Sequence, residues 1–385
     1  LPDYHPASAK LGSLQLHAKL AGDGTKIGLG EVKATLGPLT VAGSAEVALG
    51  GARPKVTLRL ATSALDLDPF LPADDGGRGP IRRPRGQAAA ASARWSTAPV
   101  DLAALKAVDA DVTLAASSLA YGQYRIEGVN LSATLDQAVL ALAGLTGKLY
   151  GGELKIAGTL DGRAEPKASL SLRLDGANLG DAGLKLGELK LRNGMLSAAA
   201  DLATSGGSEL ALVRGLNGSG ALKMQGGTID GLDLSAVNAR LAKPARAGEL
   251  IGLVQAATSG GETRIEELAG TFTVRDGVGE NKDLAIAADG ATGKGEGNVD
   301  LPRWYMDYET AFKLAGVAEA PPFFIKLKGA PDEPRKFLNA NEFQEWLVKR
   351  EAAAVGKALG KGSAQPGGNS PEGVVQDILK SLQKK

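Results

Sequence analysis

Apolar and polar residues alternate in short runs along most of this chain. In the segment 216–301, Leu222 and Met224 alternate with Ala221 and Gln225, so the two pairs point to opposite faces of a strand. The runs are separated by Asn217-Gly218, Asp230-Gly231, Asp276-Gly277 and Asp289-Gly290. Glycine after Asn or Asp tolerates the positive φ of a tight hairpin, so each dipeptide predicts a turn. The pattern predicts a sheet with one apolar face and no element nearby long enough to cover it.

The same alternation occurs in two earlier segments, 10–71 and 102–186. Residues 41–60 and 156–174 resemble each other: a Gly precedes a Pro-Lys pair, and a run of alternating leucines follows. A looser third copy covers residues 293–314. Repeats of this kind predict supersecondary units stacked on one another. The fold class we expect is mainly β, with few short helices and a helical C-terminal tail.

The chain divides into five predicted segments. They are an N-terminal β-repeat (1–75), a flexible Gly/Pro/Arg-rich loop (76–100), a second β-repeat (101–200), a C-terminal β module with a helical insert at 232–257 (201–335), and C-terminal amphipathic helices (336–385). The insert shows apolar residues at helical spacing, interrupted by Pro244. In the tail, residues 341–359 predict one amphipathic helix, and Ser370 with Pro371 predicts the start of another. These helices either pack on the end of the sheet or dock on a membrane or partner.

Charge and composition exclude several classes of function. Lys and Arg number 44 against 43 Asp and Glu, which argues against a general nucleic-acid binder. The chain has no cysteine, and therefore no disulfide framework, thiolate zinc site or cysteine nucleophile. Aromatic residues make up only 4%, less than the core of a sandwich of this size usually carries. The composition of the Arg-rich segment predicts either a solvated surface loop or a segment that contacts anionic lipid headgroups.

No residues form a recognisable catalytic or metal-binding motif. The two histidines, His5 and His17, lack metal-ligand spacing and lie near no nucleophile motif. The run 293–297 resembles a phosphate loop, but Gly295 stands where Ser or Thr is needed and a strand follows in place of a helix. The paired Glu266 and Glu267 point to opposite faces of a strand and cannot share a metal or proton. We therefore expect a protein that is not an enzyme and has no cofactor.

The central and C-terminal motifs resemble the C-terminal region of the AsmA family of bacterial envelope proteins. The resemblance rests on a G-x-I-x-G-x-D-L step (227–234), an Asp276-Gly277 strand pair, a G-x-G-x-x-D-L strand (295–301) and a closing G-x-x-x-x-P (329–334). It covers the last half of the chain best, and the earlier repeats are similar to the family's middle. The inner-membrane helix that family members carry does not occur here, as expected if it precedes Leu1.

This resemblance implies an elongated, strongly curved antiparallel sheet that forms an open β-groove. The implied setting is the periplasm, tethered to the inner membrane in the full-length protein. The implied partners are phospholipid or another membrane lipid, bacterial membranes and envelope proteins. The implied role is to shield acyl chains during transport between inner and outer membranes.

Alternation along the strands nominates the residues that line such a groove: Leu58, Leu60, Leu114, Leu140, Leu142, Leu170, Leu172, Leu222, Met224, Phe272, Val274 and Ile286. A slip of one residue would move any of them to the opposite face. These residues either line a lipid groove or fill an ordinary core. A second functional hypothesis is a non-enzymatic scaffold that lends sheet edges to outer-membrane proteins during assembly. A third, an enzyme acting on envelope glycans, needs paired carboxylates that the sequence does not offer.

Overall fold

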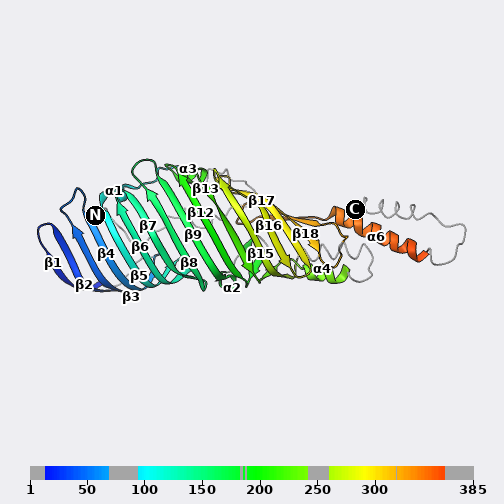
Figure 1. Cartoon of the computed structure of the whole chain (residues 1–385), viewed down its shortest axis with the longest axis horizontal. Helices are drawn as coiled ribbons and strands as arrows, with labels where there is room; N and C mark the ends of the chain where they lie inside the picture. The colour runs from blue at the N-terminus through cyan, green and yellow to red at the C-terminus, as the bar shows by residue number, and fades with distance from the viewer. Residues whose placement is uncertain are drawn as a thin grey trace.

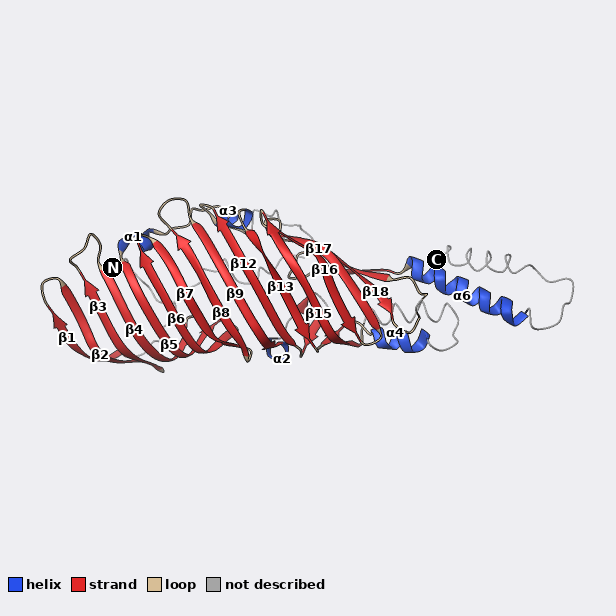
Figure 2. Cartoon of the chain, viewed as in Figure 1, coloured by secondary structure: helices blue, strands red, loops and turns tan. Residues whose placement is uncertain are grey.

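A computed structural model describes residues 14–68, 94–182, 185–186, 189–241, 260–317 and 319–359. Within them, twenty strands join in one elongated, curved sheet that does not close on itself (Figures 1 and 2). Short helices lie only at its margins and at its C-terminal end. The expected class, mainly β with an open antiparallel sheet, is confirmed.

The N-terminal half of the sheet is a run of neighbouring strands. Its first hairpins contain β1 (Leu14–Gly22), β2 (Lys26–Leu36), β3 (Leu39–Ala48) and β4 (Lys55–Asp66). After helix α1 (Ala103–Ala107) come β5 (Asp109–Tyr121), β6 (Tyr124–Asp136), β7 (Val139–Leu149), β8 (Gly152–Asp161) and β9 (Lys167–Asn178). Each strand pairs with the next in antiparallel order, except that β4 and β5 are parallel. A parallel neighbour needs a long connection, which residues 67–108 supply.

The central strands add a second, smaller layer at one margin. The elements here are α2 (Leu179–Ala182), β10 (Lys185–Leu186), β11 (Leu189–Arg192), β12 (Met195–Ser205), α3 (Glu209–Arg214), β13 (Asn217–Gln225), β14 (Thr228–Asp230) and α4 (Leu234–Leu241). In the main sheet β12 lies between β9 and β13. The short strands β10, β11 and β14 pair with one another and with the start of β15.

The C-terminal strands complete the sheet and lead into a helix. They are β15 (Glu262–Arg275), β16 (Val278–Ala288), β17 (Ala291–Asp300), β18 (Tyr305–Leu314), β19 (Phe323–Gly329) and β20 (Arg335–Asn339), followed by α6 (Asn341–Leu359). The bounds of α6 match the helix predicted there. Residues 336–339, however, extend the sheet as β20 and are not helical.

The predicted turns are only partly right. Asp276-Gly277 and Asp289-Gly290 form the β15–β16 and β16–β17 hairpin turns, as predicted. The prediction of a turn at Asn217-Gly218 is wrong, because both residues lie inside β13. Gly218 has φ +151°, and a Cβ there would stand 2.1 Å from the carbonyl oxygen of Asp201. Glycine is needed at that position for the close approach of a neighbouring strand.

Gly218→Ala is therefore expected to destabilise the fold by about 1–3 kcal/mol, from strained backbone and a forced shift of β12. Gly144→Ala is the matched control, because a Cβ at Gly144 in β7 meets no atom within 4 Å. The control should be neutral or stabilise by about 0.4–1 kcal/mol through the unfolded state. The urea concentration at the midpoint of unfolding should be lower for Gly218→Ala than for Gly144→Ala. Equal midpoints in the two variants would refute this role for Gly218.

The segment 94–100 ties the two halves of the sheet together along one margin. The indole Nε1 of Trp95 donates to the carbonyl of Leu301 at 2.8 Å, and the Arg94 guanidinium lies 3.6 Å from the ring centre of Trp304. The backbone N–H of Ser96 donates to a carboxylate oxygen of Glu209 at 2.9 Å. The segment thus connects β17–β18 with α3 before the chain returns to β5.

Several predictions lie wholly or partly outside the described residues. The Arg-rich loop is described only from residue 94, and the helical insert only as far as Leu241, which ends α4. The second tail helix, after Ser370, is not described. The division into two repeats and a C-terminal module stays a prediction, and the sheet runs through all three.

Candidate functional site

The face of the sheet that carries the leucines is built from rows of residues that lie opposite one another on neighbouring strands. Directly paired residues present their side chains on the same face. The first row, row A, follows these pairings across eleven strands: Leu29, Ala45, Leu58, Val112, Ala133, Leu142, Gly158, Leu170, Leu202, Gly218 and Val274. At about 4.8 Å per strand, row A is roughly 50 Å long.

A second row, row B, runs beside it: Gly43, Leu60, Leu114, Leu131, Leu145, Ile156, Leu172, Ala200, Gly220 and Phe272. Neither row contains a polar or charged side chain. We call the face that carries rows A and B the apolar face. The two rows form a continuous apolar strip and carry no group that could hold a charge.

The structure places all twelve residues nominated from the sequence on the apolar face. Eight of them belong to rows A and B: Leu58, Leu60, Leu114, Leu142, Leu170, Leu172, Phe272 and Val274. Leu140 and Leu222 lie two residues along β7 and β13 from row members. Met224 and Ile286 both pair with Leu268, in a further row. Their contact with lipid remains a prediction.

The sheet curves toward this apolar face. In β13 every second residue, beginning with Asn217, is exposed, whereas Gly218, Gly220 and Leu222 are half-buried. The same difference separates the exposed Ala42 from the half-buried Ala45 in β3. Side chains on the inner side of a curved sheet crowd together and lose exposure, while those on the outer side spread apart. The apolar face is therefore the inside of a trough.

Two hollows follow the rows. One, of about 660 Å³, has Gly43, Leu60, Leu114 and Leu131 of row B among its lining residues. The other, of about 760 Å³, has Leu142, Gly158, Leu170, Leu202 and Gly218 of row A in its lining. Each spans five strands, so the hollows run across the strands, along the length of the molecule.

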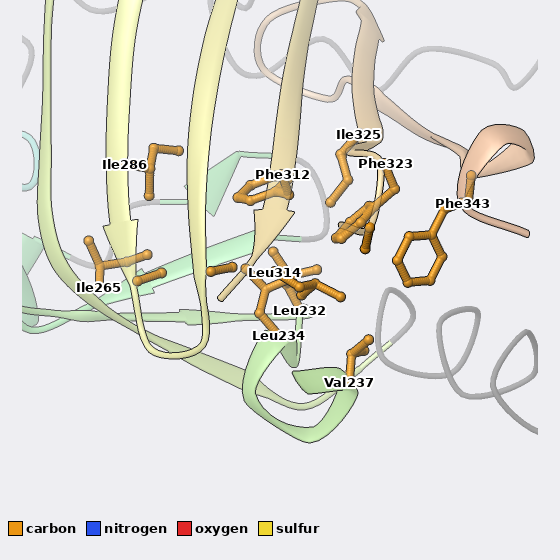
Figure 3. Close-up of a cluster of buried hydrophobic side chains, with 14 of the residues drawn as sticks. Leu232, Leu234, Val237, Ile265, Ile286, Phe312, Leu314, Phe323, Ile325 and Phe343 are labelled. Carbon is orange, nitrogen blue, oxygen red and sulfur yellow. The ribbon is translucent and has the colours of Figure 1, made fainter. Parts of the chain in front are cut away.

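The C-terminal end of the apolar face is filled by protein. A row through Met224, Leu268, Ile286, Gly293, Phe312 and Phe323 enters a buried cluster with residues of α4 and α6 (Figure 3). Phe312 stacks on Phe323 at 5.7 Å, and Phe343 of α6 meets the edge of Phe323 at 6.2 Å. Met224 and Ile286, 1% and 8% exposed, thus pack against protein. The trough is closed at this end.

Thr263 holds α4 against this closed end. Its hydroxyl, fully buried, donates to the carbonyl of Leu232 at 2.6 Å and accepts from the backbone N–H of Leu234 at 3.0 Å. Asp233 accepts from the N–H of Ala236 at 2.9 Å and so caps the first turn. The buried polar groups at this contact are satisfied, which favours a fixed position for the helix.

Tyr308 in β18 introduces a polar group on the apolar face beyond Phe272. It pairs with Gly297, and its hydroxyl donates to the side-chain oxygen of Asn281 at 2.5 Å. Burial raises the pKa of Tyr308 to about 12, and the charges of Asp283 and Glu296 add to the effect. The face therefore changes from purely apolar to partly polar where the closed end begins.

This pKa predicts a late titration. Because the folded pKa lies above the ordinary value of 10.0, the stability that Tyr308 contributes is complete below pH 10 and is lost as the pH rises through about 12. One of the six tyrosines should ionise late in an ultraviolet titration of tyrosinate. Tyr308→Phe should abolish that step, whereas Tyr305→Phe, which removes the hydroxyl of an exposed tyrosine, should not. A single step near pH 10 for all tyrosines would contradict the assignment.

The opposite face is polar and carries ion pairs between neighbouring strands. Arg173 of β9 pairs with Asp201 of β12 at 2.7 Å, and Lys223 of β13 with Glu267 of β15 at 3.2 Å. These pairs are exposed and contribute little to stability. They give this face a polar character that rows A and B on the other face do not have.

The described residues contain no group of His, Asp or Glu side chains that could hold a metal ion. None of the helices in this part of the chain combines the length and apolar composition needed to cross a membrane.

Sequence reasoning missed several members of the two rows, among them Leu131, Leu145, Ile156 and Leu202. Leu142 and Leu145 lie three positions apart, so simple alternation assigns them to opposite faces. A bulge between them restores Leu145 to the apolar face. Gly144 lies inside this bulge, and a glycine within a strand is the sequence signal that could have indicated it.

The chain is similar in sequence to known proteins. A model of the AsmA family matches residues 1–284. Protein AsmA of Escherichia coli (strain K12) is 24% identical over 304 residues, which are 76% of this chain and 47% of that protein. The chain thus spans about half the length of the curated relative it matches. No solved structure matches the chain. Because the family model covers well over half of its residues, the chain belongs to the AsmA family.

Proposed function

We propose that this protein binds lipid acyl chains along rows A and B and shields them from water during transport between the inner and outer membranes of a bacterial envelope. The observation that carries the proposal is a strip of roughly 50 Å without a polar side chain, on the inside of a curved sheet. Membership of the AsmA family supports an association with the envelope. The periplasm is the compartment that fits this role.

The energetics favour such a trough. An acyl chain of about 16 carbons exposed to water costs about 0.8 kcal/mol per CH₂, or roughly 12 kcal/mol in total. An apolar strip removes most of that cost and requires no catalytic residue. Since rows A and B contain no charge, the polar headgroup lies outside them, toward solvent.

A scaffold for outer-membrane protein assembly, the alternative, would use the sheet's edges and not its face. That role does not explain why rows A and B are free of polar side chains over so many strands. A soluble sheet without an apolar ligand would be expected to expose polar residues on its open face. The continuous apolar rows therefore favour lipid as the ligand.

Lipid analysis of the purified protein tests the proposal. Mass spectrometry should detect phospholipid or another membrane lipid that co-purifies with the folded chain, and a fluorescent phospholipid should bind and be displaced by unlabelled lipid. Transfer of that lipid between two vesicle populations should accelerate in the presence of the protein. Absence of both bound lipid and binding of the probe would refute the proposal.

A further inference from the structure

The two long margins of the sheet form the lips of the trough, because each strand runs from one margin to the other (Figures 1 and 2). The upper lip in Figure 1 carries α1 and α3, and the segment 94–107 runs along it. The backbone N–H of Val100 donates to the carbonyl of Gly207 at 2.9 Å. Leu102 packs on the β8–β9 turn, where a Cβ on Gly162 would stand 3.2 Å from its side chain. Protein thus covers part of the upper lip.

The lower lip exposes tyrosines at the turns that follow β5 and β7. Tyr121 and Tyr124 pair directly across the β5–β6 turn and are 56% and 50% exposed. Tyr150, half-buried, lies in the β7–β8 turn. The residues 121–124 and 149–152, which we call the tyrosine tips, contain no charged side chain. They hold three of the six tyrosines of the chain.

The tyrosine rings of the β5–β6 turn continue the apolar face to its margin. A row of paired, half-buried residues lies just inside this lip: Leu65, Leu119, Ile126 and Leu149. It belongs to the apolar face, because Leu149 is four residues from Leu145 of row B along β7. Tyr121 lies two residues beyond Leu119, and Tyr124 two residues before Ile126. An apolar path therefore runs from the lower lip into the trough.

The turns of the upper lip are charged. Its exposed apolar residues include Ile27, Leu49, Val278 and Tyr305, and the turn beside each carries a charge, from Asp23, Arg53, Asp276 and Arg303 respectively. At the lower lip, Asp68 lies beside the β5–β6 turn, but both of its oxygens accept from the backbone N–H of Gly122, at 3.0 and 3.2 Å. Because a charge is costly to bring into a bilayer, the tyrosine tips are better suited to enter one.

We propose that the tyrosine tips rest on the surface of a phospholipid bilayer and mark the place where an acyl chain enters the trough. Tyrosine combines an apolar ring with a hydroxyl that hydrogen-bonds at the level of the headgroups, and it is enriched at membrane interfaces. Arg125, exposed directly after Tyr124, supplies a cation for lipid phosphate. Contact with the bilayer stands by itself, whereas entry of the chain at this lip rests on the proposed function.

A fluorophore on a single cysteine tests which lip meets the bilayer. The chain has no cysteine of its own, so Gln123→Cys labels the exposed β5–β6 turn alone. Ala52→Cys, in the exposed β3–β4 turn of the upper lip, is the matched control. The vesicles contain phosphatidylethanolamine, phosphatidylglycerol and a lipid with a quencher near its headgroup. They should reduce the fluorescence of the label at position 123 about twofold or more and leave the label at position 52 unchanged.

The double variant Tyr121→Ser/Tyr124→Ser supplies the second arm. Both side chains are exposed, so the variant should keep its circular dichroism spectrum. Its binding to these vesicles and its rate of lipid transfer between them should fall about tenfold, while binding of a soluble short-chain phospholipid stays unchanged.

Three results would overturn the proposal: equal quenching at the two positions, quenching at neither, or a double variant that binds vesicles like the unmodified chain. If the short-chain lipid still binds in these cases, the proposed function survives without this lip. Quenching at position 123 in a chain that binds no short-chain lipid would uphold the bilayer contact and refute the proposed function.

Discussion

Replacing Leu114 with Asp should reduce the binding of a fluorescent phospholipid by about tenfold or more while leaving the fold intact. Leu114 sits in row B between Leu60 and Leu131 and is half-buried on the inner side of the trough. A carboxylate there would place a charge against the acyl chain in a strip that otherwise carries none. Because the side chain borders open space and not packed core, the carboxylate can stay hydrated when no lipid is bound. The apparent dissociation constant from fluorescence titration is the measurement.

The matched control is the preceding residue. Thr113 lies on the same strand, points to the polar face and pairs with Arg59 across the β4–β5 ladder. Thr113→Asp introduces the same charge beside a compensating cation, so lipid binding should change less than about twofold. If the two variants lose affinity equally, the effect comes from net charge or from misfolding and not from the apolar face. Circular dichroism of both variants separates those cases.

The second large effect is expected at the closed end. Phe343 of α6 is fully buried, 6.2 Å from the ring of Phe323 and 5.8 Å from that of Trp346. Phe343→Ala should destabilise this end by about 3–5 kcal/mol, because a buried ring is removed from a cluster that cannot collapse around the cavity. Hydrogen exchange of β19 and the first turns of α6 should then accelerate strongly. Thermal unfolding of the whole chain should begin at a lower temperature.

Phe337→Ala is the control for this change. Phe337 lies in β20, only six residues away, but is 50% exposed and points to the polar face opposite Lys326. Its removal should cost at most about 1 kcal/mol. Equal losses in the two variants would mean that α6 is not held by the aromatic cluster. The distinction matters because the same cluster closes the trough.

Alternation along single strands was enough to predict the apolar face. A strand has a side-chain period of two, so Leu58 and Leu60, or Leu170 and Leu172, had to share a face whatever their neighbours were. For the same reason Met224 was placed correctly on that face. Its burial could not be foreseen, because the cover comes from α4 and α6, which are distant in sequence. Periodicity gives the direction of a side chain but not what lies over it.

The pairings between segments far apart in the chain could not be predicted from the sequence. The parallel contact between β4 and β5 and the attachment of Trp95 to Leu301, 206 residues away, leave no local pattern. Gly218 shows the same limit: its dipeptide is typical of a turn, yet the approach of β12 is what requires glycine. Counting strands in the sequence also gives a trough of roughly 85 Å for about 18 strands, whereas row A is nearer 50 Å. Of the strands outside row A, β16 to β20 contribute to the closed end, whereas β1 lies at the opposite end of the sheet.

The central claim is that the apolar face, and not the polar face, contacts acyl chains. A photoreactive phenylalanine analogue at Leu131, in row B of β6, and another at the adjacent Ser132 report the two faces separately. After irradiation in the presence of bacterial lipid vesicles, mass spectrometry should find a lipid adduct on the Leu131 variant and little or none on the Ser132 variant. Equal adducts on both variants, or an adduct on neither, would contradict the account.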